Sequence, residues 1–265
     1  MAVGVGELSG AWNFRDVAEE TGVLPGRFFR SSELSRLSEE GRELILRLGI
    51  SDVADLRSPR EVERRGPGQV PDGVAVHLLP FPDVSAVDGE APHEATFQKM
   101  MSEKPDEEDV REAAVRFMTE EYLRFPTLGG AQRAVRQVIS LLAKGRPVIT
   151  HCFAGKDRTG FTVATVLGAV GIPRDAILAD FLRSNEAVPQ LRERILESVR
   201  DRSETPEVVT FAEARLSDEV LGVREDYLDA ARRSIEENYG TLSGYLEAAG
   251  VTAEDVARVR TALLG

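Results

Sequence analysis

The fold of this chain is decided by the stretch Val148-Ile149-Thr150-His151-Cys152-Phe153-Ala154-Gly155-Lys156-Asp157-Arg158-Thr159-Gly160. Its first residues predict a short β-strand, because β-branched side chains follow the turn residues Gly145 and Pro147. The residues after Gly160 predict a helix, since apolar side chains recur at helical spacing until a glycine and a proline end the run at 171–173. A strand, a short loop and a helix N-terminus therefore meet at residues 152–158.

Such a loop is suited to bind an oxyanion. Its N–H groups and those of the first helical turn point inward, and the helix dipole favours negative charge. The same field stabilises a thiolate, so we expect Cys152 to act as a nucleophile near neutral pH. Arg158 lies six positions later and can clasp two phosphate oxygens with its planar guanidinium. The alternative, a buried cysteine beside a solvated turn, would need two coincidences in one loop.

Length and composition predict one soluble globular domain over residues 1–265, with 42% hydrophobic and 29% charged residues. The net charge of −12 argues against nucleic acid as a partner and against loose binding to anionic membranes. The positive potential is therefore expected to be local, at Lys156 and Arg158.

The few cysteines and histidines also limit the chemistry. One cysteine allows no intrachain disulfide, and His77, His93 and His151 are too far apart in sequence for a typical metal site, so we expect neither metal nor cofactor. No apolar run is long enough to form an integral membrane segment. The first residues lack a basic start and an apolar core, which argues against a cleaved signal peptide.

Strand and helix patterns alternate along the first half of the chain. Strand patterns occupy 12–17, 26–31, 50–56 and 74–79, and Ser38 opens an amphipathic helix between the second and third of them. This order predicts an α/β fold with a central, mostly parallel sheet flanked by helices. Residues 61–73 indicate a charged connection and 85–109 a mobile acidic loop; helices are expected at 110–124, 131–142 and 174–184, and over most of 188–264.

Three further polar positions each allow two interpretations. Arg30 and Arg57 follow strands together with serines, which suits either a rim facing phosphate or internal ion pairs and helix caps. Asp83 follows a strand between prolines and could donate a proton to a leaving group or cap the next segment.

The motifs together resemble the bacterial tyrosine and lipid phosphatase family. They occur in the order of that family: Asn13-Phe14-Arg15-Asp16, Phe29-Arg30-Ser31-Ser32-Glu33-Leu34, Asp55-Leu56-Arg57-Ser58, Phe81-Pro82-Asp83 and His151 to Gly160. The resemblance implies a phosphatase-type fold and a metal-free, two-step reaction. It implies phosphoproteins, carrying phosphate on tyrosine, serine or threonine, or phosphoinositides as substrates, with inorganic phosphate as product.

The same resemblance assigns roles within the loop. Cys152 would become a phosphocysteine, while Arg158 and the amides of Phe153, Ala154, Gly155, Lys156 and Asp157 would bind the phosphate oxygens. Thr159 would hydrogen-bond the cysteine sulfur and ease its departure, and a buried His151 would shape the loop.

Two features distinguish this group from ordinary tyrosine phosphatases. Lys156 adds a cation suited to inositol head groups, and Asp157 is the first choice as general acid, with Asp83 second. The family also carries a helical lid, which we expect at 191–232 with Phe153 as its apolar contact in the loop. Because relatives leave the cell without a classical signal peptide, the resemblance is compatible with a cytoplasmic or an exported protein.

Three other functions are compatible with a cysteine in an anion-binding loop. A sulfurtransferase would carry a persulfide on Cys152, but Arg158 and Thr159 suit phosphate better. Arsenate reduction needs further cysteines, and the chain has one. A phosphate-binding module without turnover would lack an essential loop residue, and none is missing. Protein or lipid preference and the oligomeric state stay open.

Overall fold

The computed structural model describes residues 7–81, 107–201 and 206–265. Its strands are β1 (Arg15–Asp16), β2 (Phe28–Ser31), β3 (Asp52–Asp55), β4 (Ala75–Leu78) and β5 (Val148–His151). They form one sheet in the order β1-β2-β5-β3-β4, in which only β1 is antiparallel to its neighbour. The predicted α/β class with a mostly parallel sheet is thus confirmed. The strand expected at 12–17 is limited to two residues.

The central position of β5 brings the important residues together. Ser31 of β2 and Asp55 of β3 both pair in register with His151, the last residue of β5. Because these three strands run in the same direction, their carboxyl ends meet at one edge of the sheet. The segments that begin with Ser31, Asp55 and Cys152 therefore leave the sheet side by side.

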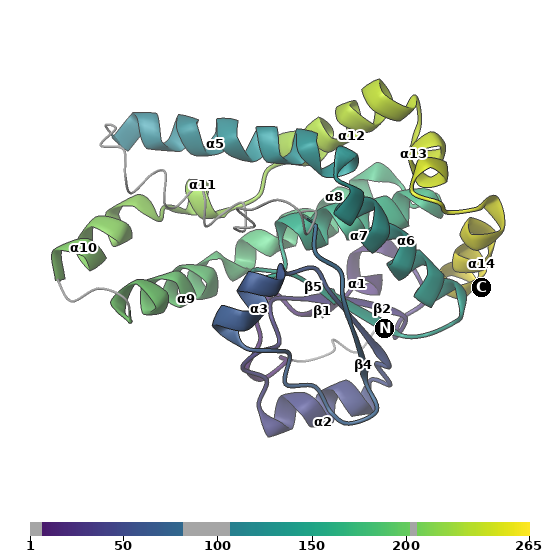
Figure 1. The fold of residues 1–265 in the computed structure, drawn as a ribbon, viewed down its shortest axis with the longest axis horizontal. Helices are drawn as coiled ribbons and strands as arrows, with labels where there is room; N and C mark the ends of the chain where they lie inside the picture. The colour runs from purple at the N-terminus through teal and green to yellow at the C-terminus, as the bar shows by residue number, and fades with distance from the viewer. Residues whose placement is uncertain (1–6, 82–106, 202–205) are drawn as a thin grey trace.

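The inner strands are buried on both faces, as parallel strands usually are. Phe28, Val148 and Ala54 belong to the main apolar core, while Phe29, Ile149 and Val53 face a smaller cluster with α2 (Glu39–Arg47). Figure 1 shows α2 below the sheet and the other large helices on its far side. Ser38 caps α2 as predicted, since its side chain accepts a hydrogen bond from the Gly41 amide.

The helices that build the main core come from both halves of the chain. They are α1 (Ala18–Thr21), α5 (Glu107–Arg124), α6 (Gly129–Ala143), α7 (Asp157–Ala169), α8 (Arg174–Leu182), α12 (Glu225–Tyr239), α13 (Leu242–Ala248) and α14 (Ala253–Leu264), with short 3-10 turns η1 (Phe125–Thr127) and η2 (Arg183–Ala187). The helices expected near 110–124, 131–142 and 174–184 are present. Most of the expected acidic loop, 85–106, lies outside the described residues, and 107–109 begin α5.

The segment 61–73 was wrongly predicted to be an irregular connection throughout. Its first part belongs to α3 (Pro59–Arg65), which Ser58 and Glu61 start with reciprocal side-chain-to-backbone hydrogen bonds. The charged composition hid a helix whose apolar face is small. This helix matters because it delivers Glu61 to the loop that follows β5.

One group of the described helices lies apart from both the main core and the cluster around α2. Its members are α9 (Val188–Arg200), α10 (Pro206–Arg215) and α11 (Asp218–Leu221), which we call the covering helices. In Figure 1 α9 and α10 extend away from the sheet on the side of α3 and α5. Their buried side chains form a separate apolar cluster with Phe153 and Ala154. No helix within the described residues is long and apolar enough to cross a membrane.

Candidate active site

The loop between β5 and α7 and the first turn of α7 contain every predicted site residue except Asp83, which lies outside the described residues. Cys152 follows the last residue of β5, and Asp157, Arg158 and Thr159 form the first turn of α7. Both ends of the loop are deeply buried, with Cys152 and Arg158 each 2% exposed. The strand, loop and helix predicted from the sequence therefore converge as expected.

The carbonyl groups of the loop bond outward to two side chains. The Asn13 side-chain amide donates to the carbonyl oxygens of Ala154 and Gly155, each at 3.0 Å. Arg30 Nη2 donates to the Gly155 carbonyl at 2.8 Å. A peptide whose carbonyl points outward directs its N–H the other way, so these bonds favour amides facing the interior of the loop.

Gly155 is required by both its conformation and its neighbours. Its φ is +68°, and a Cβ there would lie 2.2 Å from the Ser31 carbonyl oxygen. Only glycine combines this conformation with so close a backbone approach. The contact seats the loop against the end of β2, which is why the glycine of the motif cannot be exchanged for a larger residue.

Beneath the loop lies a buried cluster of charges that we call the floor: Arg15, Arg30 and Asp180. Asp180 accepts from Arg15 Nε at 2.8 Å and from Arg30 Nη1 at 2.5 Å. Burial by itself would raise the pKa of Asp180, but Arg30 and Arg15 hold it below the ordinary value. Burial lowers the pKa of Arg15 to about 10, so it stays a cation at neutral pH. Arg30 is thus an internal ion-pair residue and not part of a rim facing phosphate.

The contacts of Arg57 also decide between its two interpretations. Its guanidinium is fully buried and pairs with Asp55 at 2.7 Å and with Glu33 at 3.2 Å. The adjacent Ser58 caps α3. The internal-ion-pair and helix-cap interpretation is therefore correct at this position as well.

Glu61 fixes the guanidinium of Arg158. Arg158 Nη1 donates to Glu61 Oε2 at 2.7 Å and to the Leu56 carbonyl at 3.2 Å, and its Nη2 donates to Oε1 at 2.8 Å. These bonds use three of the five N–H donors, and the Nε–H has no partner among the described residues. Burial would lower the pKa of Arg158, but Glu61, Cys152 and Asp157 raise it above its ordinary value. Arg158 is a permanent, oriented cation with donors left for phosphate.

His151 is fully buried behind the nucleophile. Burial lowers its pKa below the ordinary value, against the opposing effect of Asp55, so the ring is neutral at physiological pH. Its Nδ1 lies 3.1 Å from the Cys152 carbonyl oxygen, and Nε2 lies 3.8 Å from Asp55. These contacts fit a role in shaping the loop.

Thr159 is buried at the start of α7, but the expected hydrogen bond to the Cys152 sulfur is not formed. Its hydroxyl has no hydrogen-bond partner in the part of the chain that the structure describes. A buried hydroxyl without a partner is costly, and it can supply a donor when a charged group develops beside it.

Lys156 and Asp157 are buried side by side, with 3.5 Å between the ammonium and Asp157 Oδ2. The ammonium of Lys156 donates to the Leu221 carbonyl at 2.6 Å, at the end of α11. Asp157 Oδ1 accepts a hydrogen bond from the Tyr122 hydroxyl at 3.2 Å. The lysine is therefore bound to a covering helix and the aspartate to α5.

Phe153 is the main contact between the loop and the covering helices. Its ring packs edge-on against Trp12 with 6.0 Å between centroids, and the Arg65 guanidinium lies 3.7 Å over its face. Around it gather the buried apolar residues of the covering helices: Val188, Leu191, Leu196, Val199, Ala212, Leu216 and Leu221. Residues 225–232, the last part of the expected lid, belong instead to α12, where Tyr227, Ala230 and Ala231 are in the main core.

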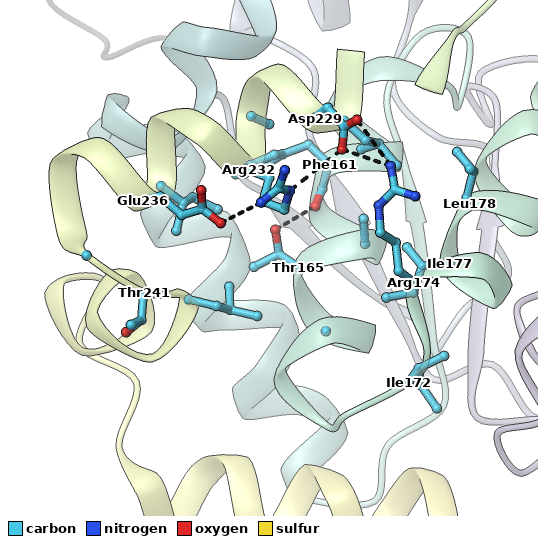
Figure 2. A pocket seen from close by; sticks show the side chains of 17 residues that line it. Phe161, Thr165, Ile172, Arg174, Ile177, Leu178, Asp229, Arg232, Glu236 and Thr241 are labelled. Carbon is cyan, nitrogen blue, oxygen red and sulfur yellow. Dashed lines mark hydrogen bonds and ion pairs between the residues drawn. The ribbon is translucent and has the colours of Figure 1, made fainter. Parts of the chain in front are cut away.

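A separate cavity of about 450 Å³ lies behind α7. Figure 2 shows apolar side chains such as Ile172, Ile177 and Leu178 along it, with Arg174 and Arg232 reaching carboxylates at its border. No residue of the loop 152–158 lines it. Within the described residues, no group of three or more metal-ligating side chains is arranged around an ion site.

The site residues missed by the sequence analysis reach the loop from distant segments. Glu61, Asp180 and Tyr122 bind the loop or the arginines that contact it, and the sequence analysis did not single them out. Asn13 appeared there only within a family motif, with no role of its own. A signal existed for Glu61, because serine followed three residues later by glutamate indicates a helix start at that point. No local pattern pairs Asp180 with Arg15 and Arg30.

Comparison with known proteins agrees with this geometry. A model of the tyrosine phosphatase family matches residues 6–265. The triple specificity protein phosphatase PtpB of Mycobacterium tuberculosis is 59% identical over 98% of this chain and 99% of the relative. A protein of Cupriavidus necator whose name carries the words tyrosine-protein phosphatase is 30% identical over 97% of this chain and 82% of its own. The chain belongs to the tyrosine phosphatase family.

Proposed function

We propose that this phosphatase hydrolyses phosphotyrosine, phosphoserine and phosphothreonine in proteins, and phosphoinositides, through a phosphocysteine intermediate. The observation that carries the proposal is a loop whose carbonyls bond outward to Asn13 and Arg30, with Cys152 at one end and Arg158, oriented by Glu61, at the other. The name of the M. tuberculosis relative, a triple specificity phosphatase, supports the breadth of substrates.

The first step transfers the phosphoryl group to the enzyme. The Cys152 sulfur forms a bond to phosphorus while the bond to the ester oxygen breaks, and the leaving oxygen takes a proton from a general acid. Arg158 and the inward amides bind the equatorial oxygens as charge builds on them. Asp157 is the preferred acid, because its carboxyl lies in the loop itself; Asp83 is the second candidate.

The second step releases phosphate. A water oxygen forms a bond to phosphorus, its proton passes to the carboxylate left by the first step, and the sulfur–phosphorus bond breaks. The Thr159 hydroxyl would donate to the departing sulfur, a role suited to a buried donor that lacks a partner in the described residues. Inorganic phosphate is the product.

Substrate access would require the covering helices to move, because the loop residues beneath them are buried. We place this lid on 188–221, and not on 191–232, since α12 packs in the main core. When the lid opens, Lys156 would lose its bond to the Leu221 carbonyl and could turn to the phosphates of a substrate.

Mechanism and acid are tested together by hydrolysis of para-nitrophenyl phosphate in excess chelator from about pH 4 to pH 9. We expect Cys152→Ser to lose at least about a thousandfold in kcat/KM. We expect Asp157→Asn to lose about a hundredfold and to lose the basic limb of the pH profile. Asp83→Asn is the matched comparison. Turnover by Cys152→Ser at the wild-type rate would contradict the phosphocysteine intermediate.

Substrate breadth is tested with one peptide sequence carrying phosphate on tyrosine or on serine, and with short-chain phosphoinositides. We expect Lys156→Met to reduce kcat/KM more for a bisphosphorylated inositol lipid than for the phosphotyrosine peptide, and Lys156→Arg to restore part of the loss, because only the polyanion gains from a second cation. An equal loss of kcat/KM on both substrates would mean that Lys156 does not contribute to the preference for lipid substrates.

A further inference from the structure

Tyr122, on a helix that none of the sequence motifs includes, contacts the phosphate-binding segment. Tyr122 lies on α5, is 0% exposed, and donates from its hydroxyl to Asp157 Oδ1 at 3.2 Å. The two residues are 35 positions apart in the chain. The bond therefore connects the first turn of α7 with α5.

Three aromatic neighbours restrict the Tyr122 ring. Phe125 lies with its centroid 4.9 Å away, Tyr227 stacks at 5.4 Å, and Phe181 packs edge-on at 6.1 Å. Phe161 of α7 extends the group through Phe125 at 5.7 Å. A ring packed on these sides cannot swing its hydroxyl away from Asp157 without disturbing the core.

The hydroxyl acts as a donor at every pH at which the enzyme works. Burial raises the pKa of Tyr122 well above its ordinary value, and the charge of Asp157 raises it further. The proton therefore stays on the tyrosine oxygen, and Asp157 Oδ1 accepts the hydrogen bond that the hydroxyl donates.

Other charged and titratable groups face Asp157 from the loop and from three helices. Lys156 and Arg158 flank it in the loop and α7, Glu121 approaches from α5 beside Tyr122, and Tyr227 approaches from α12. Lys156 lies 3.5 Å from Oδ2, on the opposite oxygen from Tyr122. The two carboxylate oxygens thus have different environments.

We propose that Tyr122 is a positioning residue that binds Oδ1 of Asp157 and so presents Oδ2 as the oxygen that protonates the leaving group. This inference rests on the proposed role of Asp157 as general acid. Oδ1 is engaged by a fixed donor, whereas Oδ2 has the Lys156 ammonium 3.5 Å away, and that ammonium donates its own hydrogen bond to a covering helix. Because Tyr122 belongs to the main core, the acid keeps its orientation when the covering helices move.

The test compares Tyr122→Phe with Tyr245→Phe. Tyr245 is also fully buried, in the same core, but its hydroxyl has no hydrogen-bond partner in the part of the chain that the structure describes. Both variants remove one buried oxygen and keep the ring. The reaction is followed with phenyl phosphate, a poor leaving group that needs its proton, and with para-nitrophenyl phosphate, a good one that needs it less.

We expect Tyr122→Phe to lower kcat/KM about tenfold for phenyl phosphate and about threefold or less for para-nitrophenyl phosphate. Tyr245→Phe should change neither. In an Asp157→Asn background, Tyr122→Phe should have no further effect on the leaving-group dependence.

Two failures are distinguishable. If Asp157→Asn keeps the wild-type basic limb and leaving-group dependence, Asp157 is not the acid and the assignment under the proposed function fails. If Asp157→Asn loses both but Tyr122→Phe matches Tyr245→Phe, the acid stands and the positioning role of Tyr122 is wrong. An equal loss on both substrates would likewise mean that Tyr122 contributes only packing.

Discussion

The floor and the cover of the phosphate loop are built from different interactions. On the floor, Asp180 lies between Arg15 and Arg30, all three are buried, and Arg30 continues to the Gly155 carbonyl. On the cover, Phe153 and Ala154 meet the apolar side chains of α9, α10 and α11. The covering helices also make ion pairs: Arg36–Glu197 is exposed, with side chains 54% and 39% exposed, whereas Arg194 of α9 pairs with the buried Glu33 at 3.0 Å.

This difference distinguishes the floor, which must stay intact for the loop to keep its shape, from the covering helices, which can move. Removing one partner from the floor leaves a buried charge uncompensated, which costs far more than the pair gains by forming. Moving the covering helices away breaks apolar contacts, exposed ion pairs and the Arg194–Glu33 pair, but water can solvate the separated surfaces and Glu33 keeps Arg57 as a partner. The loop can therefore stay formed while it is uncovered.

The largest effect should follow from breaking the floor. We expect Asp180→Ala to lower the free energy of unfolding by about 3–5 kcal/mol, because Arg15 and Arg30 are left buried without an anion. Urea denaturation measures it, and kcat should fall in the folded fraction because Arg30 loses its orientation. Asp180→Asn, which keeps the shape, is the control and should cost less. A loss under about 1 kcal/mol for Asp180→Ala would mean that the floor does not depend on its ion pairs.

The floor should also make stability depend on pH in a defined direction. The pKa of Asp180 is lower in the folded protein than its ordinary value, so its contribution is present above the ordinary value of about 3.9 and is lost as pH falls through the lower folded-state value. We expect the wild type to lose more unfolding free energy than Asp180→Asn between about pH 5 and pH 2. If the unfolding free energies of the two proteins fell in parallel with pH, the loss of stability in acid would come from other carboxylates.

A smaller change in stability, but a larger change in access, should follow from loosening the cover. We expect Leu191→Ala to speed alkylation of Cys152 by iodoacetamide about threefold to tenfold, because a weaker apolar contact raises the open population. Leu263→Ala is the matched control, since Leu263 is fully buried in α14 within the main core. It should destabilise the protein by about 2–4 kcal/mol without faster alkylation under native conditions. Equal alkylation rates for the two variants would argue that the helices do not control access.

The smallest effect concerns the cavity behind α7, which belongs to neither the floor nor the cover. Ala164 lines it, and we expect Ala164→Leu to raise the free energy of unfolding by about 0.5–1 kcal/mol by filling empty space. Thermal unfolding measures the gain, and the alkylation rate of Cys152 should stay unchanged. A changed alkylation rate would show that packing along α7 is coupled to the loop.

The chemistry of the loop was predictable because its parts are adjacent in sequence. The predicted strand and helix place Cys152 and Arg158 at the two ends of one short turn, and the spacing between them needs no knowledge of the rest of the chain. The cap of α2 at Ser38 was predictable for the same reason, since a helix start is a local event. Arg30 and Arg57 left two interpretations open, because their partners lie in other segments.

The remaining parts of the site depend on which distant segments meet. Glu61 lies on a helix that was interpreted as a loop, although its capping residues were readable. Asp180 is 165 positions from Arg15, and Tyr122 lies on a helix whose pattern indicates only core packing. Nothing in the spacing of these residues specifies an encounter, because an ion pair or hydrogen bond between them forms only after the helices have docked.

By itself, then, the sequence determined the nucleophile, the arginine, the turn between them and the α/β class, since these follow from local backbone preferences and periodicity. Only the tertiary structure decided which carboxylate orients Arg158, which side chains bind the loop carbonyls, and which helices lie over Phe153. The physical reason is that charge pairing and burial depend on distance in space, and the path of the chain between two positions sets that distance only when the whole core has packed.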